Sequence, residues 1–114
     1  MMPMISMIRG ACQQFRFKTP YPLSQLQTVR ITFWQQGDDG RDIEPIPTKL
    51  ITDCTENGTP GFVYVTLDQR ETLAFKSDRE AFVQFRALPI AGCAFSSFIE
   101  PITVYPTKDE TVLE

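Results

Sequence analysis

The sequence predicts an all-β sandwich of about seven short strands, for three reasons. Apolar and polar residues alternate with the two-residue period of half-buried strands, as in CQQFRFK (12–18). Clusters of Gly, Pro, Asn and Asp recur roughly every 8 to 12 residues. No long helical segment separates the strands, as a parallel α/β fold would require. The 114 residues suffice for one domain and are too few for two.

The first half of the chain carries two regular strands and one irregular segment. Phe15 and Phe17 define the inner face of the first strand, and the prolines that follow it fix φ and lack an N–H donor. The second strand places Trp34 on its polar face. The irregular segment holds Pro45 and Pro47, which predict a sheet edge or a bulge. The predicted segments are strand 12–18, break 19–23, strand 28–35, turn 36–40, and 41–54 with a short strand in KLITDC.

The second half contains the strongest strand signal, FVYVTL, which is β-branched and aromatic throughout. An Asn-Gly and a Pro-Gly pair precede it and predict a hairpin loop. Pro101 places the last strand at an edge or at a bulge. The predicted segments are loop 56–61, strand 62–67, a helical turn, turn 76–80, strand 81–88, turn 89–94 and strand 95–105.

The helical turn lies in LDQRETLAF (67–75). Asp68 and Glu71 have the spacing of a capping box, in which each side chain accepts a hydrogen bond from the other residue's backbone N–H. We expect this turn to carry the chain from one sheet to the other, with Leu73 and Phe75 closing the end of the core. Such crossovers are common in immunoglobulin-like sandwiches, so the predicted fold is an immunoglobulin-like antiparallel β-sandwich with one short helical turn near residues 68–74. The predicted divisions are an N-terminal extension (1–10), the sandwich domain (11–106) and a flexible charged tail (107–114).

Composition narrows the classes of function. The net charge of −3 and the pI of about 4.9 argue against nucleic-acid binding. No apolar run approaches ~18 residues, so no membrane-spanning segment is expected. The first residues lack the features of a secretory signal peptide. Cys12, Cys54 and Cys93 are widely spaced and odd in number, which predicts reduced, buried thiols.

The chain offers little for catalysis. It has no histidine, which removes the commonest general base and metal ligand and excludes Ser-His-Asp and Cys-His arrangements. No phosphate-binding glycine loop is present. Asp38, Asp39, Asp42 and Glu44 form the densest carboxylate cluster, but their order is that of a polar turn rather than a calcium loop. We therefore expect neither an enzyme nor a metal or other cofactor.

Several aromatic residues are predicted to face away from the core. One interpretation is that loops, strand ends or the second sheet cover these rings. The functional interpretation is an exposed patch that docks on another protein. A third is a carbohydrate- or host-surface-binding module that uses Trp34, Tyr64 and Tyr105 as stacking platforms. The candidate interface residues are Trp34, Phe62, Tyr64, Phe82 and Tyr105.

Several short motifs follow one another in a distinctive order. They are MIRG (7–10), Asp53-Cys54, LDQRETLAF (67–75), VQFRAL (83–88) and the closing SSFIEPITVYPTKDETVLE. In this order they resemble a family of small proteins from tailed-phage and prophage structural gene modules, and the resemblance covers the chain from Met7 onward. The chain departs from the family pattern in the preceding MMPMIS and in the additional prolines and acids of residues 36–61.

The resemblance implies a small β-sandwich protein made alongside virion parts, and it carries over no catalytic residues. The expected function is that of a non-enzymatic structural or accessory virion protein associated with the tail or baseplate. The expected partners are other phage structural proteins, or further copies of the chain itself, with neither nucleic acid nor membrane. The protein is then expected in the virion after synthesis in the bacterial cytoplasm.

Overall fold

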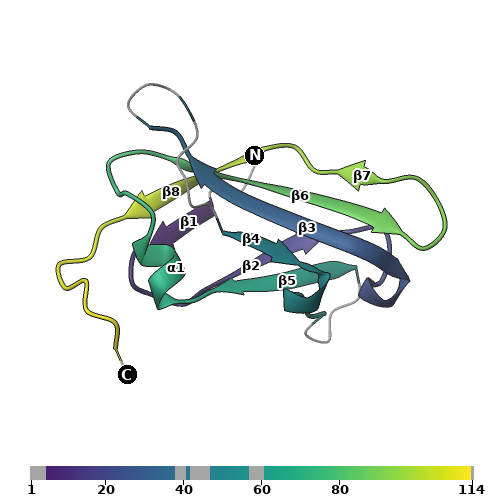
Figure 1. Ribbon diagram of the computed structural model, residues 1–114, viewed down its shortest axis with the longest axis horizontal. Helices are drawn as coiled ribbons and strands as arrows, with labels where there is room; N and C mark the ends of the chain where they lie inside the picture. Colours follow the sequence, from purple (N-terminus) through teal and green to yellow (C-terminus); the bar gives the residue numbers. More distant parts are fainter. Residues whose placement is uncertain (1–4, 38–40, 42–46, 57–60, 114) are drawn as a thin grey trace.

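The structure is a computed structural model and describes residues 5–37, 41, 47–56 and 61–113. Its strands confirm the all-β sandwich predicted from the sequence (Figure 1). The carboxylate cluster Asp38, Asp39, Asp42 and Glu44 lies outside these ranges, as do Pro45 and residues 57–60 of the predicted hairpin loop. The elements are β1 (Ile5–Ile8), β2 (Gln13–Lys18), β3 (Leu26–Gln35), β4 (Thr48–Leu50), β5 (Phe62–Leu67), α1 (Gln69–Leu73), β6 (Ala81–Pro89), β7 (Phe95–Ser96) and β8 (Glu100–Tyr105), with 3-10 turns at Leu23–Gln25 and Ile51–Asp53.

The two sheets differ greatly in size. The large sheet has six strands in the order β1-β8-β6-β3-β4, with β7 paired to β6 beyond this path. The small sheet consists of β2 and β5 alone, which pair antiparallel. Figure 1 shows the small sheet lying beneath the large one. The sequence indicated two layers but not this uneven division, because strand pairing depends on contacts between distant segments.

The core fills the space between the sheets, and aromatic rings join the two layers. Phe15 and Phe17 point inward from β2, as their alternation predicted. The ring of Phe15 lies 5.1 Å from that of Phe33 in β3, measured between centroids. The ring of Phe17 lies 5.5 Å from that of Phe85 in β6. These cross-sheet contacts hold the sheets in one relative position, since close-packed rings tolerate little displacement.

Helix α1 connects the two sheets, as expected, and it begins with the predicted capping box. The backbone N–H of Glu71 donates to Asp68 Oδ1 at 2.9 Å, and the backbone N–H of Asp68 donates to Glu71 Oε1 at 3.0 Å. The chain passes from β5 in the small sheet through α1 to β6 in the large sheet. Phe75 is buried at the end of the core, whereas Leu73 is only partly buried. Thr72, which was not predicted as a core residue, is fully buried in this helix.

The N-terminal residues belong to the sandwich rather than to an extension. Strand β1 pairs in parallel with β8, Ile5 opposite Ile102 and Ile8 opposite Tyr105. Met7 is fully buried. The boundary predicted at residue 10 is therefore wrong for residues 5–8. Four residues are too few for their alternation to be recognised, and their partner strand lies at the other end of the chain.

The predicted strand 95–105 is divided into β7 and β8 by residues 97–99. The cause is a local exchange of hydrogen bonds with β6. The backbone N–H of Phe85 donates to Ser97 Oγ at 3.0 Å, and the backbone N–H of Ser97 donates to the Phe85 carbonyl at 2.8 Å. A side chain thus replaces a backbone acceptor of the ladder, and regular pairing resumes only at Glu100.

Candidate functional site

The outer side of the large sheet is a broad surface that no other element of the described chain covers (Figure 1). Because the inner residues of β3 and β6 face the small sheet, the residues between them point outward. Strand register arranges these outward residues in cross-strand rows. We call them together the outer face, and its rows are Trp34–Phe82–Pro101, Thr48–Thr32–Gln84 and Leu50–Arg30–Arg86–Ser96, followed by the pair Thr28–Leu88.

The first row contains a contact between two aromatic rings. Trp34 of β3 lies directly opposite Phe82 of β6, and their ring centroids are 5.8 Å apart with an interplanar angle of 30°. Both side chains are half-buried. Since each ring restricts the other, the pair presents apolar area that loses little conformational freedom on binding.

The third row sets two positive charges side by side. Arg30 and Arg86 are direct cross-strand partners, and both are exposed. Within the part of the chain that the structure describes, neither guanidinium has a partner in an ion pair or a hydrogen bond. Leu50 and Leu88 flank them with exposed fractions of 45% and 37%. Both arginines and both leucines line an open groove of about 250 Å³.

The composition of the outer face differs from that of the whole chain. Its rows contain two arginines and no aspartate or glutamate, although the chain carries a net charge of −3. Protein interfaces are enriched in tryptophan and arginine and depleted of lysine, aspartate and glutamate. The outer face shares this pattern, since its rows contain tryptophan and arginine and no lysine, aspartate or glutamate.

The candidate interface residues named from the sequence do not form one surface. Trp34 and Phe82 touch on the outer face, and Tyr105 lies on the outward side of β8 beside Ile8, away from the ring pair. Phe62 and Tyr64 point outward from the small sheet, on the opposite side of the sandwich. There the guanidinium carbon of Arg16 lies 4.9 Å from the centre of the Phe62 ring, a cation–π contact.

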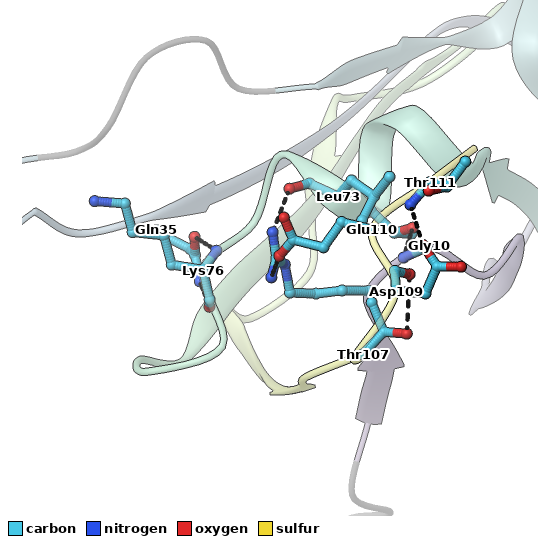
Figure 2. Close-up of polar contacts among 10 residues, drawn as sticks. Gly10, Gln35, Leu73, Lys76, Thr107, Asp109, Glu110 and Thr111 are labelled. Atoms are coloured by element: carbon cyan, nitrogen blue, oxygen red, sulfur yellow. Dashed lines mark hydrogen bonds and ion pairs between the residues drawn. The ribbon is translucent and has the colours of Figure 1, made fainter.

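Away from the outer face, a cluster of polar contacts joins the two end segments of the chain. Arg9 forms an ion pair with Glu110, and its Nη2 donates to the backbone carbonyl of Leu73 at 3.1 Å (Figure 2). The side-chain amide of Gln69 donates to the backbone carbonyl of Leu113 at 2.9 Å and accepts from its N–H at 2.8 Å. Residues 107–113, predicted to be a loose tail, thus fold back against α1.

Gln35 holds the turn between α1 and β6 from inside the protein. It is 4% exposed, and its Nε2 donates to the backbone carbonyls of Lys76 at 2.7 Å and Arg79 at 3.2 Å. Its Oε1 accepts from the backbone N–H of Lys76 at 2.8 Å (Figure 2). Next to this turn, the side chain of Arg79 hydrogen-bonds Asp78 and lowers the pKa of that carboxyl. These contacts fix the position of the turn.

The thiols are placed differently from one another. Cys54 is buried, and burial, aided by the nearby charge of Asp53, raises its pKa to about 11. Its Sγ lies 3.3 Å from the carbonyl of Leu50. Cys12 and Cys93 are exposed, so the prediction that all the thiols are buried is wrong for these two. Among the described residues, no cluster of three or more carboxylates and thiols has a geometry that could hold a metal ion.

Comparison with protein-family models and with curated proteins adds no relative. No protein-family model matches the chain, and no curated protein matches it. In the described ranges, no helix is both long and apolar enough to cross a membrane.

The meeting of Arg30 and Arg86 was not predicted from the sequence. Alternation alone places both residues on the polar sides of their strands. That they face each other follows from the register of β3 against β6, which no pattern within either strand encodes. Leu50 and Leu88 were not predicted as site residues either, because they look like ordinary strand residues until the sheet is assembled.

Proposed function

We propose that this protein is a non-enzymatic structural or accessory protein of a tailed-phage virion, associated with the tail or baseplate, and that it docks on another virion protein through the outer face. The observation that carries the proposal is the meeting of the Trp34–Phe82 ring pair with the unpaired Arg30 and Arg86 on one sheet face that the described chain leaves uncovered. The phage context comes from the resemblance of the ordered motifs described above.

The proposal is supported by the way in which protein interfaces distribute their binding energy. A few buried aromatic and arginine anchors supply most of the binding energy, while the residues around them exclude water. The Thr32–Gln84 pair, between the aromatic and arginine rows, suits such surroundings. The chain has no histidine, and the only buried thiol of the described chain has a raised pKa, which supports binding rather than catalysis.

The carbohydrate-binding alternative receives less support from the geometry. Sugar stacking would use Trp34, Tyr64 and Tyr105 as platforms. Tyr64 lies on the small sheet, on the opposite side of the molecule from Trp34, and Tyr105 is separated from the ring pair along β8. The three rings therefore cannot contact a single sugar unit.

The test is mass spectrometry of purified phage particles produced with the wild-type chain, with Trp34→Ala or with Tyr64→Ala. We expect the wild-type and Tyr64→Ala proteins in the particles and a marked loss of Trp34→Ala, because only Trp34 lies on the outer face. Circular dichroism of each purified variant shows whether it is folded. Absence of the wild-type protein from particles whose other minor proteins are detected would overturn the proposal.

A further inference from the structure

We infer that the groove over Arg30 and Arg86 binds a glutamate or aspartate side chain flanked by apolar side chains, carried on an extended acidic segment of a partner protein. The inference rests on the proposed function and adds to it the chemistry of the partner. The groove is lined by Arg30, Arg86, Leu50, Leu88, Thr28 and Phe95, together with two alanines.

The charge of the occupant follows from the two arginines. Direct partners on neighbouring antiparallel strands have Cα atoms about 4.5–5.5 Å apart, so two like charges at such a pair repel. Neither guanidinium forms an ion pair or a hydrogen bond with any residue in the described ranges, so the repulsion is not offset there. A carboxylate held between two guanidiniums would accept charge-assisted hydrogen bonds from both and would remove the repulsion.

The remaining residues that line the groove indicate which side chains should flank the carboxylate in the bound segment. Leu50 lies beyond Arg30 on β4, and Leu88 lies two residues beyond Arg86 on β6. Both leucines are substantially exposed. Phe95 reaches the groove from the inner side, because it lies opposite the buried Ala87 and its ring packs against Phe85. A segment that places apolar side chains on either side of its carboxylate would cover these surfaces. In an extended segment, residues i−2 and i+2 lie on the same side as residue i and meet this requirement.

A protein segment suits the groove better than a nucleic acid or a large cofactor. A nucleic acid would require a continuous basic path, whereas the neighbouring row holds Thr48, Thr32 and Gln84 and the chain has a pI of about 4.9. A volume of about 250 Å³ accommodates one or two side chains, less than the roughly 300–1,000 Å³ of typical small-molecule sites.

The experiment is an NMR titration of the full chain with the peptide acetyl-Leu-Thr-Glu-Thr-Leu-amide. We expect shifts of the Arg30 and Arg86 side-chain N–H signals. Binding should weaken about tenfold or more when either arginine is changed to glutamine, because each supplies charged hydrogen bonds. Arg16→Gln, on the opposite side of the sandwich, is the matched control and should bind normally. The peptide with Gln in place of Glu should bind at least as weakly as the arginine variants.

Three outcomes would overturn the inference. They are the absence of shifts at millimolar peptide, equal shifts with inorganic phosphate, and tighter binding of single-stranded DNA than of the peptide. The spectrum of each variant also shows whether it is folded, so a loss of binding cannot be confused with unfolding. If the peptide does not bind but the protein is found in phage particles, only the inference about the groove fails. The proposed function then stands, since mass spectrometry of the particles does not depend on this groove.

Discussion

Lys49 and Glu71 form an ion pair that ties the edge of the large sheet to the crossover helix. Lys49 Nζ lies 2.6 Å from Glu71 Oε2 and 2.8 Å from Oε1. The same Oε1 accepts the backbone N–H of Asp68 and so completes the capping box. Lys49 points inward because the register of β4 sets it opposite Ile31, an inner residue of β3. One carboxylate therefore caps α1 and fixes it to β4.

We predict that Glu71→Ala lowers the free energy of unfolding by about 1–3 kcal/mol, since it removes a cap and leaves a partly buried lysine unpaired. Glu71→Gln should cost less, because glutamine also serves at this position of a capping box. Urea denaturation measures both variants, and Lys49→Met isolates the ion pair. Equal stability of wild type and Glu71→Ala would show that this contact contributes nothing to the fold.

Phe85→Ala should destabilise the protein by about 3–5 kcal/mol, because the change leaves a cavity in a packed core. Phe85 is 1% exposed and its ring contacts those of Phe17 and Phe95. Phe98, which is 87% exposed, is the matched control, and its change to alanine should alter stability by no more than about 0.5 kcal/mol. A cost below about 1 kcal/mol for Phe85→Ala would contradict its assignment to the core.

Local pattern predicted the parts of this fold that depend on one segment at a time. Strand β5 was predicted with its observed ends, and the capping box of α1 was predicted with both of its hydrogen bonds. Features that join distant segments could not be predicted in this way. The parallel pairing of β1 with β8 and the meeting of Arg30 with Arg86 both depend on register, which the whole sandwich determines.

Cys54 should make the free energy of unfolding depend on pH in the alkaline range. Its pKa rises from 9.0 to about 11 on folding, so the folded protein retains a proton that the unfolded chain loses between these values. The free energy of unfolding therefore falls as the pH rises from about 9 to about 11, and Cys54→Ala should lack this part of the fall. Urea titrations across this pH range measure the difference. Parallel curves for the two proteins would contradict the account.

The same placement of thiols predicts their reactivity. With a chromogenic disulfide reagent at about pH 8, Cys12 and Cys93 should react quickly because both are exposed. Cys54 should react only after denaturant is added, since it is buried and its pKa is raised. Rapid reaction of every thiol in the folded protein would show that Cys54 is accessible.

The repulsion between Arg30 and Arg86 should be measurable without any partner. Arg86→Gln should raise the free energy of unfolding by about 0.2–1 kcal/mol at low salt, because it removes a directly opposed like charge. Added salt should reduce the gain, since exposed charges are screened. Arg16→Gln is the control and should not stabilise, because Arg16 contacts the Phe62 ring. A loss of stability in Arg86→Gln at low salt would argue that the arginine has a stabilising partner.

The most direct test of the proposed docking surface is photo-crosslinking in purified phage particles. A photoreactive amino acid replaces Thr32, at the centre of the outer face, or Gln14, which is exposed on the outside of the small sheet. We expect a crosslink to another virion protein from position 32 and none from position 14. Crosslinks from position 14 alone, or none from position 32 in particles that contain the protein, would contradict this expectation.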